Sequence, residues 1–196
     1  MIFISLGSTC CITQQLKNHN LRQNAYPFDW IRITNLNNVS KLLDNHFCDF
    51  LNLEEMQFIE FSDRFLINNV SGSYIYKNKY CGFYHEFSKI LNEKNYNSFR
   101  SKYERRIERL FGLLKSNNEI IFVREEIGKI KISKIMNLID KLKKINSQMN
   151  FEIIIITNDK KYQEIDLHNV KFYFTRDKIT HWTRPDIDWF KIFKRK

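Results

Sequence analysis

Two adjacent cysteines follow the first apolar run of the chain. The run IFISL (2–6) predicts a buried strand, Gly7 ends it, and a helix is expected from about residue 9 to 19. A thiol attacks only as the thiolate, and the free N–H groups and dipole of a first helical turn favour that anion. Neighbouring helical residues point about 100° apart, so we expect Cys10 to face outward and Cys11 to pack. This place suits a nucleophilic Cys10; two small buried thiols are the alternative.

The pattern of apolar runs predicts the elements that must position these cysteines. Strand, helix, strand is typical of a parallel α/β sheet. We expect one α/β domain over 1–196, with a mostly parallel sheet, helices on both faces (three layers, Rossmann- or flavodoxin-like) and an inserted hairpin region at about 52–97. Ser8 or Thr9 is expected to cap the first helix and Ser133 a later one. Further strands are predicted at 120–124, 151–157 and 170–175, helices at 36–51, 98–115 and 131–146, and a hairpin at 73–83 with its turn near Lys77-Asn78.

Polar residues follow each strand of the predicted sheet. They are found at 7–10, 124–126, 157–159 and 175–177. Ligands of open parallel sheets bind beyond the carboxyl ends of the strands, so this pattern places Cys10 where a site is expected. Arg124 ends a central strand at the same edge. It is a candidate for binding a substrate, and an ion pair with a neighbouring glutamate explains it equally well.

Several short blocks, in order from residue 4 to about 124, resemble one known family. They are SLGSTC (5–10), QLK (15–17), LR (21–22), YPFDW (26–30), FYHEF (83–87), YERRI (103–107) and IFVR (121–124). They are similar to the family described as "putative papain-like cysteine peptidase", which is found in large DNA viruses and bacteria. A weaker similarity continues into the tryptophan-bearing C-terminal part.

The resemblance implies a catalytic pair. Cys10 matches the family's nucleophile position, and His85 stands where the family has H-D-F and this chain has H-E-F. His85 would take the thiol proton and later protonate the leaving group. A carboxylate would orient the imidazole, with Asp29 the first choice and Asp188 the second. The papain signature around the nucleophile is absent, and a strand–turn–helix differs from papain's two lobes.

Other residues extend or compete with this site. The backbone after Gly7, at Ser8 and Thr9, could hold an oxyanion or a phosphate at the helix N-terminus. Arg106 or its neighbour Arg105 could bind a phosphate or a carboxylate, and pairing with nearby glutamates is the alternative.

Two further residues keep a different enzyme class open. Ser8 could serve as the nucleophile of an SGNH-like esterase, although the Asp of the G-D-S motif is missing. His181 is the second candidate base, and Asp177 lies one residue too far from it for that family's late D-x-x-H.

Composition and charge limit the remaining classes. The chain is 43% hydrophobic and 15% aromatic, which suits a packed core. No long apolar run predicts a membrane span, and no signal peptide is recognisable, so we expect a cytoplasmic protein, in the host cytoplasm if it is viral. Four cysteines without metal-ligand spacing predict neither a metal nor a disulfide framework, and we expect no cofactor.

The net charge of +10 permits an anionic partner, and a phosphate- or nucleic-acid-binding module is the main alternative to an enzyme. The leading interpretation is a cysteine-dependent hydrolase, a papain-like peptidase or an acyl transferase. It would act on a peptide or an acylated substrate. The sequence leaves the oligomeric state open.

Overall fold

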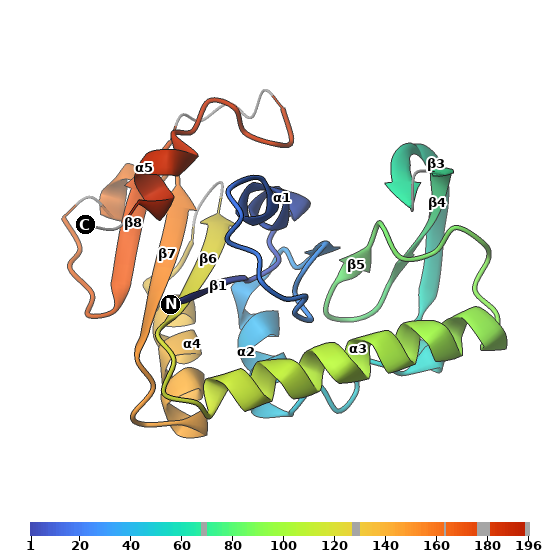
Figure 1. Cartoon of the computed structure of the whole chain (residues 1–196), viewed down its shortest axis with the longest axis horizontal. Helices are drawn as coiled ribbons and strands as arrows, with labels where there is room; N and C mark the ends of the chain where they lie inside the picture. The colour runs from blue at the N-terminus through green and yellow to red at the C-terminus, as the bar shows by residue number, and fades with distance from the viewer. Residues whose placement is uncertain (68–69, 127–129, 163, 176–180, 195–196) are drawn as a thin grey trace.

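The computed structural model describes the chain except residues 68–69, 127–129, 163, 176–180 and 195–196 (Figure 1). It is a mixed α/β fold with two four-stranded sheets. The first sheet is parallel and consists of β1 (Ile2–Ser5), β6 (Ile120–Glu126), β7 (Phe151–Thr157) and β8 (Val170–Phe174), in that order. Phe3 pairs with Ile121, and Ile154 pairs with Lys171. The predicted parallel sheet is therefore confirmed, with boundaries within two residues of those expected.

Helices cover both faces of the parallel sheet, as predicted. On one face, α1 (Cys10–Asn18) and α5 (Trp189–Phe193) pack on side chains such as Phe3, Ile121 and Ile154. On the other face, α2 (Leu36–Asp44), α3 (Glu93–Leu114) and α4 (Ile132–Ile145) share a core with Phe122 and Ile153. The buried strands are apolar on both faces because both faces are covered.

The second sheet is antiparallel and lies beside the first (Figure 1). Its order is β2 (Ile31–Arg32), β5 (Gly82–Phe83), β4 (Val70–Lys77) and β3 (Gln57–Ile67). The predicted hairpin is the β4–β5 pair, and its turn follows Lys77. The inserted region contains more sheet than expected, since β3 pairs along β4. The described residues also form two short 3-10 helices, η1 (Leu53–Glu55) and η2 (Lys160–Tyr162).

One hydrophobic cluster, on the α2, α3 and α4 side of the parallel sheet, joins the two sheets. Its buried members include Leu6 and Phe122 from the parallel sheet, Ile31 and Phe83 from the antiparallel sheet, and Tyr103 from α3. In Figure 1, α3 runs along one side of the molecule, from below β4 to below β6. The long helix therefore fixes the second sheet against the first.

Three local predictions needed correction. The helix expected over 36–51 ends at Asp44, where Asn45 caps it and the next two residues, His46 and Phe47, adopt positive φ. The helix expected from 98 begins at Glu93, behind a capping box that Asn92 forms with Asn95. Ser133 does not cap α4, because the N-cap position is Lys131, which makes no side-chain cap bond. Within the described chain, no helix combines the length and apolarity needed to cross a membrane.

Candidate functional site

The turn between β1 and α1 is built around Gly7. This residue has φ +65°, and a Cβ placed on it would lie 2.8 Å from the carbonyl oxygen of Phe28. Its own carbonyl accepts a hydrogen bond from the N–H of Ile33 (2.6 Å), while its N–H donates to Ser5 Oγ (3.2 Å). A side chain at position 7 would therefore disturb both the backbone conformation and the attachment of this turn to the segment after β2.

Thr9 caps α1, so Cys10 occupies the first position of the helix. Thr9 has extended backbone, and its hydroxyl accepts a hydrogen bond from the N–H of Cys11 (3.4 Å). Cys10 is partly exposed, whereas Cys11 is 1% exposed and belongs to the core under α1 and α5. Cys11 packs as expected, and Cys10 is the more exposed of the two, although it is only partly exposed.

A buried polar network fixes this helix start to the ends of β6 and β8. The Thr9 hydroxyl also donates to Glu125 Oε2 (3.3 Å), and Glu125 forms an ion pair with Arg184. Arg184 is fully buried and also contacts Thr175 (2.5 Å) and Asp186 (2.8 and 3.0 Å). The predicted convergence of polar residues at this edge is thus present for β1, β6 and β8. Nothing in its local sequence distinguished Arg184, which belongs to the C-terminal segment that folds back onto the sheet.

Burial governs the ionisation of Cys10. Burial is the largest cause that raises the pKa of the Cys10 thiol to about 12; the Arg32 guanidinium opposes this shift, and Glu86 adds a smaller contribution to it. A helix N-terminus favours the thiolate, but the net shift at Cys10 is upward because desolvation is the largest contribution. The thiol is protonated at neutral pH, so it needs a base if it is to attack a carbonyl.

His85 lies among aromatic rings, two residues after the end of β5. Its ring is 5.7 Å from that of Trp30 and 5.2 Å from that of Phe65, both edge-on. Trp30 directly precedes β2, and Arg32 of β2 lowers the pKa of the Cys10 thiol. Glu86, the residue after His85, raises it. Arg32 of β2 and Glu86, the residue after His85, are therefore the charges from this side of the molecule that influence the Cys10 thiol.

Glu86 is the buried charge of this region. Its side chain is 3% exposed, pairs with Lys102 and accepts a hydrogen bond from the hydroxyl of Tyr103 (2.9 Å). Arg106 lies 3.9 Å from the same carboxylate and over the Tyr103 ring, while Arg105 is exposed. Of the two arginines, it is therefore Arg106 that lies next to the candidate site.

The two carboxylates considered for orienting His85 have other contacts. Asp29 is 2% exposed and accepts hydrogen bonds from Thr13 (3.5 Å), Arg22 (2.9 Å) and the N–H of Tyr26 (3.1 Å). Burial raises the pKa of Asp29, and Arg22 opposes this shift. Asp188 is exposed and caps α5 by accepting from the N–H of Lys191 (3.0 Å). Asp29 thus stabilises the YPFDW turn, and Asp188 stabilises a short helix.

Arg124 is fully buried and bonded through all three guanidinium nitrogens. It donates to the carbonyls of Leu6 and Ile33 (2.9 Å each) and pairs with Glu126. Burial lowers its pKa, while Glu126 raises it. Of the two interpretations open from the sequence, these contacts favour the ion pair over binding to a substrate or phosphate.

Ser8 and His181 receive little support as an alternative pair. Ser8 is half-buried, and within the described ranges its hydroxyl has no imidazole or carboxylate partner. His181 is exposed, and its Nδ1 lies 2.7 Å from the hydroxyl of Thr183. Asp177 lies outside the described residues.

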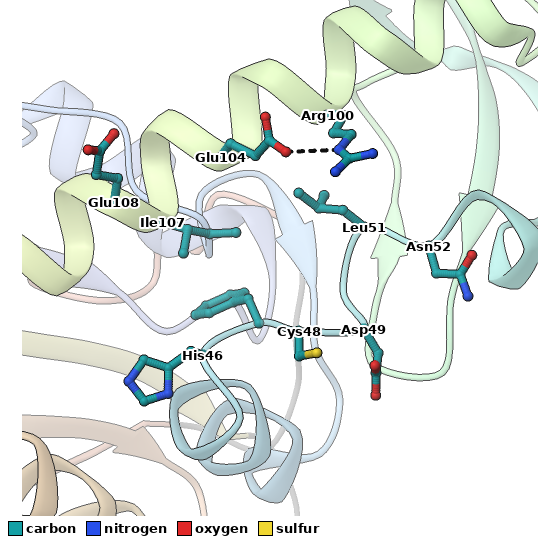
Figure 2. A pocket seen from close by; sticks show the side chains of 10 residues that line it. His46, Cys48, Asp49, Leu51, Asn52, Arg100, Glu104, Ile107 and Glu108 are labelled. Atoms are coloured by element: carbon teal, nitrogen blue, oxygen red, sulfur yellow. Dashed lines mark hydrogen bonds and ion pairs between the residues drawn. The ribbon is translucent and has the colours of Figure 1, made fainter.

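Two hollows open near α3, and Cys10 lines neither of them. The larger, of about 550 Å³, lies between α3 and the loop after α2 (Figure 2). It contains a second cysteine and histidine, Cys48 and His46, but their side chains point away from each other, and His46 stacks on Phe111. The smaller, of about 350 Å³, begins at Glu86. Among the described residues, no three His, Cys, Asp or Glu side chains gather as a metal site would require.

Comparison with known proteins finds the family that the sequence blocks indicated. The model of a family described as "putative papain-like cysteine peptidase" matches residues 1–161. The "Uncharacterized protein R408" of Acanthamoeba polyphaga mimivirus is 30% identical over 215 residues, which cover 97% of this chain and 96% of the relative. No solved structure matches the chain.

Proposed function

Because the chain belongs to the "putative papain-like cysteine peptidase" family, we propose that it is a cysteine-dependent hydrolase or acyl transferase with Cys10 as its nucleophile. The observation that carries this proposal is the partly exposed Cys10 at the head of α1, electrostatically coupled to Arg32 and to Glu86, the residue after His85. No other described cysteine combines a helix start, partial exposure and a neighbouring cation. The closest competitor, Cys48, lies in an open hollow beside an imidazole that points elsewhere.

The raised pKa of Cys10 determines how such a reaction would begin. Since the resting thiol is protonated, the His85 imidazole takes the proton as the sulfur attacks the substrate carbonyl carbon. A C–S bond forms, and the carbonyl oxygen becomes an oxyanion beside the backbone of Ser8 and Thr9. The positive charge of Arg32 stabilises the negative charge that develops on the sulfur and so offsets part of the cost of burying it.

The second half of the reaction returns the enzyme to its starting state. The intermediate collapses with cleavage of the C–N, C–O or C–S bond of the substrate, and His85 gives its proton to the leaving amine, alcohol or thiol. Water then loses a proton to His85 and attacks the thioester, which releases the acid and restores the thiol. An amine or alcohol in place of water would make the same cycle an acyl transfer.

Turnover of a peptide or thioester substrate tests the proposal. Cys10→Ala and His85→Gln should each reduce the rate at least about 100-fold, the scale of lost nucleophilic or general-base catalysis. His168→Gln, a change at an exposed histidine, should leave the rate unchanged. Urea unfolding of all three variants separates a lost reaction from a lost fold. Folded Cys10→Ala or His85→Gln protein with normal turnover would refute the proposal.

A further inference from the structure

The smaller hollow, which we call the basic hollow, combines an apolar floor with positive charge. Its floor includes Phe87 and Phe99, each 3% exposed, and its volume is about 350 Å³. Three of its lining residues are cationic: Lys89, Lys102 and Arg105. A ligand that fits both features has an aliphatic stem and an anionic end.

The charges in the basic hollow are not balanced. Glu86 is the only carboxylate in its lining, and Glu86 is already bonded to Lys102 and to the Tyr103 hydroxyl. Lys89 and Arg105 are exposed, and within the described part of the chain neither has a carboxylate partner. Two cations therefore remain available for an anion from outside.

Glu86 connects the basic hollow to the proposed nucleophile. Its carboxylate lines the hollow and also contributes to the raised pKa of the Cys10 thiol. His85 is the residue before it. Glu86 thus belongs both to the lining of the basic hollow and to the charges that influence the Cys10 thiol.

We propose that the basic hollow is a specificity subsite that binds glutamate or aspartate side chains of a polypeptide substrate. The inference rests on the proposed function, because that function supplies the polypeptide. Arg105 and Lys89 bind the carboxylate, and the methylene groups of the ligand pack on Phe87 and Phe99. Binding of a nucleic acid fits less well, since the hollow offers two free cations rather than a row of them along a backbone.

Binding to the Cys10→Ala protein tests the subsite without requiring catalysis. The probe is a fluorescein-labelled peptide rich in glutamate, compared with the same peptide carrying glutamine, and the readout is anisotropy at low salt. We expect the acidic peptide to bind about tenfold more tightly. In the added double variant Lys89→Gln/Arg105→Gln, this preference should disappear.

A matched control separates the subsite from the overall positive charge. The double variant Lys17→Gln/Lys143→Gln also removes two exposed cations, and it should keep the preference for the acidic peptide. Equal loss in both double variants, or no preference at the start, would overturn the inference. So would a single-stranded oligonucleotide that binds as tightly as the acidic peptide and depends on Lys89 and Arg105.

The inference and the proposed function can fail separately. Acidic-peptide binding that depends on the basic hollow, without any turnover by unmodified protein, would keep the subsite and refute the hydrolase. Turnover through Cys10 that shows no preference for acidic side chains would keep the hydrolase and refute the subsite.

Discussion

The ionisation of Cys10 can be followed by alkylation across a range of pH. Its pKa of about 12 lies three units above the usual 9.0. At pH 8 the thiolate fraction is then about 0.01%, against about 10% for an ordinary thiol, a difference of about 1000-fold. Iodoacetamide should therefore modify Cys10 in the folded protein at least about 1000-fold more slowly than in urea, with the rate rising about tenfold per pH unit from 8 to 11.

Peptide mapping by mass spectrometry measures this rate for Cys10 alone. Restricted access to the thiol lowers the rate by a constant factor and leaves its pH dependence unchanged, so the position of the plateau reports the pKa. Arg32→Gln should move the plateau to higher pH, and Glu86→Gln should move it to lower pH, because each removes one of the charges that act on the thiol. A plateau below pH 9 in the unmodified protein would refute the argument that burial dominates.

Three further predictions concern stability, measured by urea unfolding. Gly7→Ala should cost about 1–3 kcal/mol, because Gly7 has a positive φ and a Cβ there would meet the carbonyl of Phe28. Gly112→Ala, in open space on α3, should instead stabilise by about 0.5–1 kcal/mol. A stabilising Gly7→Ala and a destabilising Gly112→Ala would contradict the argument that position 7 requires glycine. Arg124→Gln should cost about 3 kcal/mol or more, because it leaves the buried carbonyls of Leu6 and Ile33 without their donor. A loss below about 1 kcal/mol would show that these contacts contribute little to stability. Burial raises the pKa of Cys11, so the native thiol keeps its proton at a pH where the unfolded thiol loses it. The free energy of unfolding should therefore fall above about pH 9, by up to about 1.4 kcal/mol per pH unit for each such thiol, and less steeply in Cys11→Ala. Equal pH slopes in Cys11→Ala and the unmodified protein would contradict this.

The parallel sheet could be predicted because its strands are continuous apolar runs with helices between them. The end of α2 could not be predicted from spacing. Phe47 and Phe50 are buried in the same core as Leu43, so the apolar pattern continues past the point where Asn45 ends the helix. β3 was missed because its residues 57–61 are exposed on both faces, and its pairing with β4 is a tertiary contact that local patterning does not encode.

The family blocks indicated Cys10 and His85 as site residues, and these roles stay predictions. The expectation that polar residues gather beyond the strand ends places Cys10 at the edge where Thr9, Glu125 and Arg184 meet. The contacts of Arg124 and Asp29 depend on carbonyls and side chains from several elements, which the sequence does not bring together by spacing. Arg32 was missed altogether, although it follows the YPFDW block by only two residues. Its relation to Cys10 depends on the second sheet docking against the first.

The position of a trapped acyl group tests the central claim most directly. The protein would be mixed with a reactive acyl thioester at pH 7.5, quenched within one turnover, and analysed by intact mass and peptide mapping. We predict one acyl group on Cys10, absent in Cys10→Ala and at least about 100-fold slower to form in His85→Gln. An acyl group on Cys48 or Ser8, or formation at Cys10 that is unaffected by His85→Gln, would contradict the account.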